Sequence, residues 1–437
     1  RMEGILVYNL YPRLVGKFEQ MKSHAVRAKE MGFQYVYLNP VALPGFSGSS
    51  YAIKNHYLYH PIHYKGWPLE GEDYSEKNLS KNKNLAESEF QDFIEFCNEI
   101  GIKVMLDLVI NHTSIDSNLV NEHGVWYKRS KRGNLINPGV KEHGNYIKWG
   151  DLALIDNKRS EDKKALWNYW LELLEHYLKL GIKGFRCDAA YKVPTELWRF
   201  LIKNSKNNNS EIVFLAETLG CTPKELEKIG ACGFDIVMNS FKWWNLKDDW
   251  FLKDYNEWSN KYQSLIFPEN HDTLRYAHEF GINKDKAVFT YALQCFFCSS
   301  IAITLGFEYG FTNKIDVVTT NPSDYEEANY DLSEEISKIN KLKKTYPILK
   351  EDNYIEQLHL GDNIFAFKKK SRDGEKTLVL IANLDENNWK RVEYIDFYKL
   401  FDSEKIKDIS IGHQMEKVPN WFEYYLKPYE IKLFYKD

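Results

Sequence analysis

Four short segments carry acidic, basic and imidazole side chains directly after runs of apolar residues. They are Asp107-Leu-Val-Ile-Asn-His112, Gly184-Phe-Arg-Cys-Asp188, Phe214-Leu-Ala-Glu217 and Phe267-Pro-Glu-Asn-His-Asp272. An isolated aspartate at the end of a strand is usually a helix cap or a turn residue. Four such segments in order along one chain instead indicate a shared site, because strands that end at a common edge bring their last residues together.

These side chains suit the cleavage of a glycosidic bond with retention of configuration. One carboxylate attacks the anomeric carbon, and a protonated carboxyl group gives its proton to the leaving oxygen and then acts as a base. We expect Asp188 to be the nucleophile, because Arg186 lies two residues earlier, on the same face of the strand, and would hold it ionised. We expect Glu217 to be the acid/base, since apolar neighbours and a nearby negative charge raise the pKa of a carboxyl group.

A second set of residues is expected to bind the sugar ring. Asp272 would bind hydroxyl groups and stabilise a distorted ring, and His112 and His271 would form hydrogen bonds with the same sugar. Trp243 and Trp244 could line an acceptor subsite, although packing in the core explains them equally well.

Eight short apolar runs provide the strands that would position these residues. They cover residues 4–9, 33–38, 103–110, 184–187, 212–216, 236–238, 264–267 and 301–305. Near-continuous apolar runs are typical of parallel strands buried on both faces. Amphipathic runs over 90–100 and 166–180, each followed by glycine, predict helices between the strands. Eight strands alternating with helices favour a closed (β/α)8 TIM barrel over an open doubly wound sheet.

Two long segments interrupt this alternation. Residues 39–86 and 113–157 lack a helical period and would emerge at the C-terminal ends of strands, where barrel active sites lie. The asparagine-rich tract 204–210 is instead predicted to be a plain loop on the opposite face. β-like runs at 353–359, 363–369, 377–383 and 430–435 predict an antiparallel β domain. We predict a catalytic barrel over 1–112 and 158–350, an insertion over 113–157 and a C-terminal β domain over 351–437.

The composition excludes some classes of protein. The 437 residues carry a net charge of only −4, which argues against a partner such as nucleic acid. Residues 287–307 contain no charge and are long enough to span a bilayer, but their polar residues favour a buried helix that runs into a buried strand. The six cysteines form no spaced disulfide framework, and no leader segment is visible. We therefore expect a cytoplasmic protein without a membrane partner, and leave its oligomeric state open.

The ordered motifs D-x-x-x-N-H, G-x-R-x-D, A-E and N-H-D resemble those of glycoside hydrolase family 13, the α-amylase family, over nearly the whole chain. The resemblance implies that Tyr51 stacks against the sugar at the cleavage subsite, with an ordinary loop aromatic as the alternative, and that Glu269 has no direct role. It implies roles for six further residues: Asp188 as nucleophile, Glu217 as acid/base, Asp272 as third carboxylate, and Arg186, His112 and His271 near the sugar. Lys192, where the sequence departs from the family pattern, is also expected to bind substrate.

A calcium site is a second implication of the resemblance. Many members of the family bind calcium through the asparagine that matches Asn111 and through acids in the insertion. The insertion is short here and offers no clear set of six to eight oxygen ligands. Lys192 stands where many calcium-binding members have histidine, and its ammonium group would replace the cation, touch an acceptor sugar or lie in solvent. We expect no required metal or other cofactor, with calcium as the alternative.

The expected activity is that of a retaining glycosidase acting on α-1,4 bonds of α-glucans or maltooligosaccharides. The alternative is an α-glucan transglycosylase, because segments 123–129, 192–194 and 214–218 are similar to the branch that includes maltosyltransferases acting on maltose 1-phosphate. A glycine-rich phosphate cradle is not evident. A non-catalytic subunit would show broken motifs, and an aldolase would need a strand-end lysine with a lowered pKa. The sequence shows neither feature.

Overall fold

The computed structural model describes residues 2–69, 75–392, 396–421 and 423–437, and its centre is a closed barrel of parallel strands. The strands follow the order β1-β14-β13-β12-β11-β10-β5-β2 around the barrel. Their bounds are β1 Leu6–Leu10, β2 Tyr35–Leu38, β5 Lys103–Leu108, β10 Gly184–Cys187, β11 Val213–Ala216, β12 Ile236–Met238, β13 Gln263–Ile266 and β14 Ser300–Thr304. Each overlaps one predicted run, so the predicted (β/α)8 barrel is confirmed.

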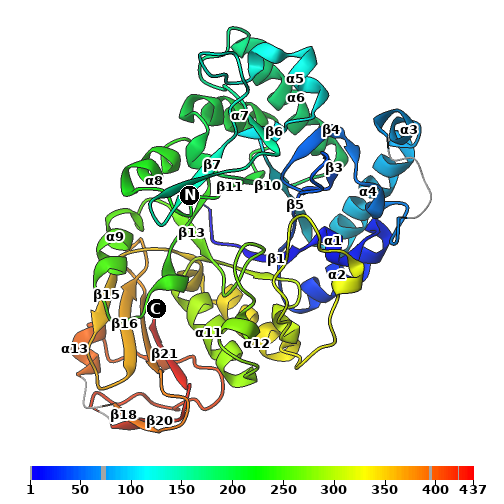
Figure 1. Ribbon diagram of the computed structural model, residues 1–437. Coiled ribbons are helices and arrows are strands. Elements are labelled where there is room, and N and C mark those ends of the chain that lie inside the picture. The colour runs from blue at the N-terminus through cyan, green and yellow to red at the C-terminus, as the bar shows by residue number, and fades with distance from the viewer. Residues whose placement is uncertain (1, 70–74, 393–395, 422) are drawn as a thin grey trace.

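Helices follow the strands and surround the barrel (Figure 1). The longer ones are α2 Phe18–Glu30, α4 Lys83–Ile100, α6 Lys163–Leu180, α7 Thr195–Asn208, α8 Pro223–Gly230, α9 Trp250–Trp258, α11 Lys284–Phe297 and α12 Ser333–Thr345. Helices α4 and α6 end at Gly101 and Gly181, whose φ angles of 86° and 106° suit glycine, as the sequence predicts. The prediction of a loop over 204–210 is wrong for most of that tract, because α7 continues to Asn208.

Two layers of apolar side chains fill the molecule. Inside the barrel, inward-facing residues such as Val7, Met105 and Leu215 pack against one another. The alternate, outward-facing residues of the strands, such as Leu6, pack between the strands and the helices. Strand register pairs Gly184 with Met105, so Asp107 and Arg186, two residues further along, also point into the barrel.

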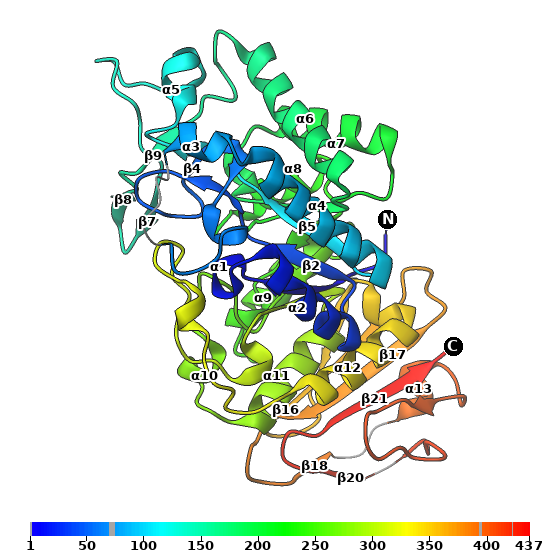
Figure 2. The ribbon, with the colours of Figure 1, turned by 90° about the vertical axis from the view of Figure 1, so that its right-hand side faces the viewer.

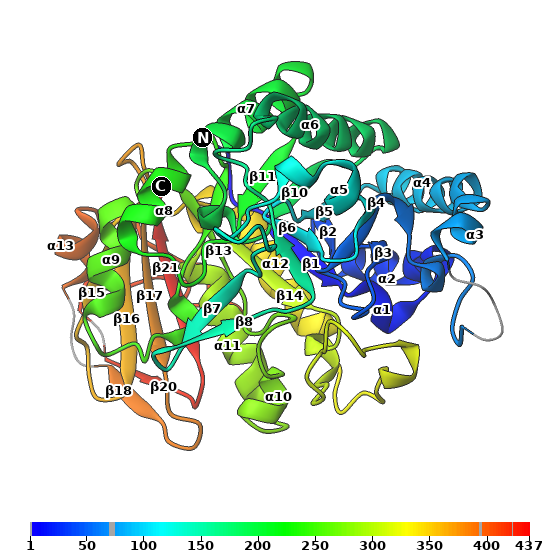
Figure 3. The ribbon, with the colours of Figure 1, turned by 45° about the horizontal axis from the view of Figure 1, so that its top comes forward.

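The two long segments have more regular structure than the sequence predicts. Within 39–86, strands β3 Ala42–Pro44 and β4 Ile53–Tyr59 form an antiparallel pair, and helix α3 covers Glu76–Ser80. Within 113–157, β6 His112–Ser114 pairs with β9 Leu152–Leu154, and β7 Gly139–Glu142 pairs with β8 Asn145–Lys148. Figure 3 shows the β7–β8 hairpin lying over the end of the barrel.

The C-terminal part is an antiparallel sheet, as predicted, in the order β15-β16-β17-β21-β19. Its strands are β15 Ile355–Leu358, β16 Ile364–Lys370, β17 Thr377–Asn383, β19 Lys407–Asp408 and β21 Ile431–Lys436, with β18 Lys390–Val392 and β20 Tyr424–Leu426 as a separate pair. The sheet lies beside α11 and α12, far from the insertion (Figure 2). The uncharged stretch 287–307 belongs to α11 and β14, and no helix in the described residues is long and apolar enough to cross a membrane.

Candidate active site

Strand register brings Asp188 and Glu217 together. Cys187 at the end of β10 pairs with Ala216 at the end of β11, and the two acids are the next residues of these parallel strands. The backbone N–H of Glu217 donates to the Cys187 carbonyl at 3.0 Å. Neighbouring strands lie about 4.8 Å apart, and retaining cleavage needs carboxyl groups roughly 5–5.5 Å apart. The spacing of the strands therefore suits a nucleophile and an acid/base.

Arg186 supplies the positive charge that the sequence predicts beside Asp188. Its Nη1 donates to Asp188 Oδ1 at 2.6 Å and to Asp107 Oδ1 at 3.1 Å. Burial alone would lower the pKa of Arg186, but the charge of Asp107 and its neighbours holds that pKa well above its usual range. A buried cation thus contacts the carboxylate that would attack the sugar.

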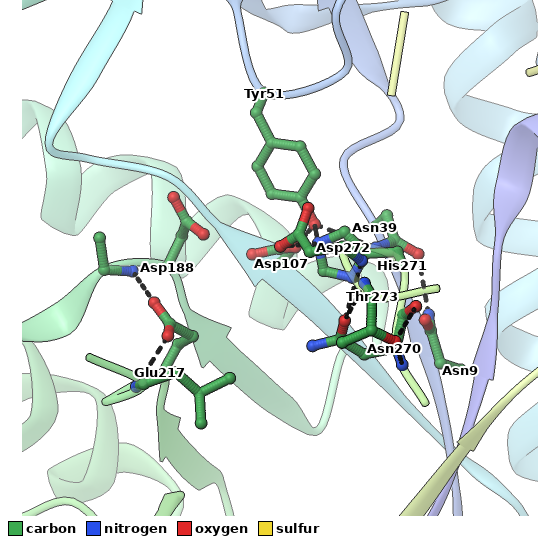
Figure 4. A network of polar contacts seen from close by, with 12 residues as sticks. Asn9, Asn39, Tyr51, Asp107, Asp188, Glu217, Asn270, His271, Asp272 and Thr273 are labelled. Atoms are coloured by element: carbon green, nitrogen blue, oxygen red, sulfur yellow. Dashed lines mark hydrogen bonds and ion pairs between the residues drawn. The ribbon is translucent and has the colours of Figure 1, made fainter. Parts of the chain in front are cut away.

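Glu217 lies in surroundings that favour its protonated form. Burial raises the pKa of Glu217, the charge of Arg186 opposes this, and the charge of Asp188 adds to it. Both carboxyl oxygens accept backbone N–H groups at 2.9 Å, Oε2 from Ala189 and Oε1 from Leu219 (Figure 4), and these bonds oppose part of the upward pKa shift of Glu217 without cancelling it. Ala189, which donates one of these N–H groups, has a left-handed backbone with φ of 42°. The direction of the pKa shift is the one that the sequence predicts.

Tyr51 connects the residues expected to bind the sugar. Its ring stacks on His271 with centroids 5.3 Å apart and an interplanar angle of 9°. Its hydroxyl donates to Asp107 Oδ2 at 2.6 Å, lies 2.9 Å from His271 Nε2 and accepts from Asn39 Nδ2 at 3.0 Å (Figure 4). His112 Nε2 lies 3.1 Å from the Tyr51 carbonyl oxygen. The predicted sugar-binding residues Tyr51, His112 and His271 are therefore in direct contact.

Asp107 is a residue of the site to which the sequence assigned no role. Its carboxylate is buried and accepts hydrogen bonds from Tyr37, Tyr51 and Arg186. Burial raises the pKa of Asp107, and the charge of Arg186 opposes this. The first motif contains this aspartate. Alternate residues of a strand face the same side, and the position of Asp107 along β5 was the signal that could have placed it inside the barrel.

Asp272 faces the same cavity from the loop after β13. The side-chain oxygen of Asn270 accepts the backbone N–H groups of Asp272 at 2.8 Å and Thr273 at 3.0 Å, which fixes the turn. Partial burial opposes ionisation of Asp272, but His271, whose Nε2 lies 3.2 Å from Oδ2, lowers the pKa of Asp272 to about 2. Glu269 forms a buried ion pair of 2.9 Å with Arg275, and that it has no direct role stays a prediction.

Lys192 links the insertion to the barrel. Its Nζ donates to the Gly139 carbonyl at 3.2 Å and lies 5.4 Å from the ring centroid of Trp149. An ammonium group thus already contacts the insertion where a cation would bridge it to the barrel. The described residues also include no cluster of three or more His, Cys, Asp or Glu side chains that could hold a metal ion. The residues at this junction do not fit a calcium ion, and the absence of a calcium requirement stays a prediction.

The carboxylates open into a cavity of about 490 Å³. Trp243 lines it and is 50% exposed, whereas Trp244 is 5% exposed and packs against Phe251 in the core. Trp243 is therefore open to the cavity, whereas Trp244 packs in the core, the alternative that the sequence allowed for it. The other lining residues that matter for the chemistry come from the insertion and from several strand ends: Asn111, His112, Val140, Trp149, Arg186, Asp188, Tyr191, Lys192, Glu217, Leu219, Asn270 and Asp272.

Known proteins resemble this chain in sequence and in fold. The family model "Glycogen debranching enzyme, glucanotransferase domain" matches residues 1–127. The α-1,4-glucan:maltose-1-phosphate maltosyltransferase of Picrophilus torridus is 23% identical over 404 residues, and that of Myxococcus xanthus is 24% identical over 383 residues. These alignments cover 87% and 82% of this chain but only 60% and 54% of the relatives.

Solved structures share the whole architecture. An α-amylase from Lactobacillus plantarum superposes with a TM-score of 0.74 at 20% identity, and covers 99% of both chains. An α-amylase from Geobacillus thermoleovorans in complex with acarbose has a TM-score of 0.75 at 14% identity, with coverage of 99% of this chain and 98% of the other. At these identities the solved structures show only that the fold is shared. The similarity in sequence rests on the ordered motifs and on the maltosyltransferase relatives. The chain is thus similar in sequence to maltosyltransferases and in fold to α-amylases, in line with its resemblance to glycoside hydrolase family 13.

Proposed function

We propose that the chain is a retaining α-1,4-glucan transglycosylase that moves a maltosyl unit from maltose 1-phosphate to the end of a glucan chain. The observation that carries the reaction class is the placement of Asp188 and Glu217 at the ends of paired strands. Arg186 contacts Asp188, and the pKa of Glu217 is raised. The donor and acceptor are suggested by the relatives, which are named maltosyltransferases.

The first half of the reaction forms a covalent intermediate. A carboxylate oxygen of Asp188 attacks the anomeric carbon of the donor, while the proton of Glu217 passes to the leaving phosphate oxygen. The bond between the anomeric carbon and the phosphate oxygen breaks, and a glycosyl ester on Asp188 remains. Arg186 contacts Asp188, whose negative charge is lost in this step, and His271 contacts the third carboxylate, Asp272.

The second half regenerates the enzyme. Glu217, now ionised, accepts the proton of an acceptor hydroxyl, whose oxygen attacks the anomeric carbon and releases Asp188. Water in place of the acceptor would give hydrolysis, which was the first expectation from the sequence. Transfer is preferred here because the family model is also named for a glucanotransferase domain.

Product analysis tests this proposal. The enzyme would be incubated with maltose 1-phosphate and maltohexaose, and we expect chains lengthened by two glucose units together with an equal amount of inorganic phosphate. Inorganic phosphate added to a long glucan should give maltose 1-phosphate in the reverse direction. Free maltose as the main product would show that the enzyme is a hydrolase and overturn the proposed transfer. The Asp188→Asn variant is the control for any contaminating activity.

A further inference from the structure

We propose that a cavity lined by lysines, next to the catalytic cavity, binds the phosphate group of a small ligand. This cavity has a volume of about 590 Å³ and lies where the insertion, the segment after Asp188 and helix α8 meet. Lys128, Lys158, Lys192 and Lys228 line it, and we call it the lysine cavity. The inference goes beyond the proposed function and does not depend on whether the enzyme transfers sugars or hydrolyses them.

The four ammonium groups come from four separate segments of the chain. Lys128 lies in the insertion, Lys158 directly before α6, Lys192 in the short helix η3 Ala190–Lys192, and Lys228 in α8. Helix α8 packs against η3, so these two elements form one wall of the lysine cavity. All four lysines are exposed, so a ligand in solution can reach them.

Ion pairs do not balance these positive charges in the part of the chain that the structure describes. Among the described residues, only Lys192 has an acceptor for its ammonium group, the Gly139 carbonyl at 3.2 Å. Two acidic residues, Asp156 and Glu196, also line the lysine cavity. Oδ1 of Asp156 already accepts the backbone N–H of Arg159 at 2.9 Å. Four positive charges therefore face two negative ones, one of which is engaged with the backbone.

A surplus of positive charge in a cavity favours an anion over a metal cation. Clefts lined by one sign of charge raise the local concentration of ions of the opposite sign. Lysine binds phosphate as a point charge, without the planar geometry that arginine requires. Ammonium groups from several directions therefore suit a phosphate group, which offers oxygen acceptors on all sides.

The remaining walls fit an organic body attached to the phosphate. Leu154, Ile155, Val193 and Pro194 line the same cavity and would pack against such a body. The volume also lies in the range of about 300–1,000 Å³ that is usual for small-molecule sites. The phosphate would come from a small phosphate ester or from free inorganic phosphate.

Lys192 connects the lysine cavity with the catalytic cavity. Lys192 and Tyr191 line both cavities. The ammonium group of Lys192 donates to Gly139 at the start of β7 and lies 5.4 Å from the ring centroid of Trp149. A bound phosphate would compete with the Gly139 carbonyl for this group, because a charged acceptor forms the stronger hydrogen bond. Binding would thus draw Lys192 away from the Trp149 ring and loosen the contact between the hairpin and the segment after the nucleophile.

Isothermal titration calorimetry with inorganic phosphate, glucose 6-phosphate and AMP tests the site. We expect a Kd below about 1 mM for at least one probe at low salt. The Kd should rise as salt is added, because salt screens contacts between exposed charges. A lower Kd for glucose 6-phosphate or AMP than for inorganic phosphate assigns the site to a phosphate ester. An equal or higher Kd assigns it to inorganic phosphate.

Substitutions of single lysines locate the binding. Lys128 and Lys228 do not line the catalytic cavity, and Lys128→Met and Lys228→Met should each raise the Kd about fivefold, the upper end for an exposed pair of charges. The Lys128→Met/Lys158→Met/Lys228→Met variant should raise it about a hundredfold if the three effects add. Lys224→Met is the matched control and should leave the Kd unchanged, because Lys224 is exposed on the same helix but does not line the lysine cavity.

Tryptophan fluorescence follows the coupling in the same titrations. The ligand should change the emission of the wild type, and Trp149→Phe should lose this change but keep its Kd. A change that persists in Trp149→Phe would refute the coupling through Lys192. The phosphate site itself is overturned if no probe binds with a Kd below about 1 mM, or if the triple variant binds like the wild type. These readouts do not require turnover, so a failure of the proposed transfer would be seen separately, in the product analysis.

Discussion

The hydroxyl oxygen of Tyr51 contacts several residues of the site at once. Replacing Tyr51 with phenylalanine keeps the ring on His271 but removes contacts to Asp107 at 2.6 Å, His271 at 2.9 Å and Asn39 at 3.0 Å. Burial raises the pKa of Tyr51, so the hydroxyl keeps its proton and acts as a donor at neutral pH. The substitution therefore removes one hydrogen bond to the Asp107 carboxylate and the contacts to His271 and Asn39, without a change in ring packing.

The loss of stability depends on the hydrogen bonds that each partner of the hydroxyl retains. A hydrogen bond to a charged group contributes about 1.5–3 kcal/mol. Asp107 keeps its bonds from Tyr37 at 2.5 Å and Arg186 at 3.1 Å, which places the loss in the lower half of this range. We expect Tyr51→Phe to lower the free energy of unfolding by about 2 kcal/mol, and kcat/KM to fall about tenfold, because small displacements of positioning residues have large effects on rate.

Urea unfolding and steady-state kinetics measure the two effects. The matched control is Tyr425→Phe, whose hydroxyl also donates to a carboxylate, Glu423, at 2.9 Å, but on the surface. The control should change stability by less than about 0.5 kcal/mol. The reasoning is refuted if Tyr51→Phe behaves like the control in unfolding and keeps kcat/KM within twofold of the wild type. Loss of stability with unchanged kinetics would limit the role of the hydroxyl to folding.

Three further predictions concern the carboxylates and the metal. Asp188→Asn and Glu217→Gln should each lower turnover by about three orders of magnitude or more, measured as phosphate or reducing-sugar release, and near-normal turnover in either would contradict the assigned roles. Because Glu217 must be protonated to donate and burial raises its pKa, activity should persist above the usual titration range of a glutamate and fall only as pH rises through the raised pKa; a kcat/KM profile that already falls between pH 4 and 5 on its basic side would argue against this. Treatment with EDTA should leave activity and Tm unchanged, since Lys192 already donates to the insertion, and a large drop in Tm would show that a bound cation is required.

The strands and the proximity of Asp188 and Glu217 could be predicted because their signals are local. An apolar run of four to eight residues predicts a buried strand without knowledge of its neighbours, and β10 and β11 both occur where such runs were found. Once eight strands form a barrel, their C-terminal ends must meet, so Asp188 and Glu217 were predicted to lie near each other. The register of these strands then places them side by side.

Other features depend on contacts between distant segments and had no local signal. The prediction of a loop over 204–210 followed from the poor helix propensity of asparagine. Helix α7 nevertheless continues through this tract, where Ser205 is buried and Lys206 forms an ion pair of 2.6 Å with Asp235. Strand β3 is short and pairs irregularly with β4, so its sequence lacks the alternation that predicts a strand. Trp149 lines the cavity although no role was predicted for it from the sequence, because the β7–β8 hairpin meets Lys192, which lies outside the insertion.

Asp107 shows why the site needs more than its predicted carboxylates. A guanidinium group inside the barrel with Asp188 as its only partner would be free to follow that carboxylate when the glycosyl ester forms and the charge of Asp188 is lost. Asp107, held by Tyr37 and Tyr51, gives Arg186 a second, permanent partner that does not react. In the proposed reaction, the positive charge would therefore stay in place through both halves, with no reorganisation when Asp188 leaves the sugar. Because Tyr51 also contacts His271, the same carboxylate fixes the groups around the donor sugar and the charge beside the nucleophile.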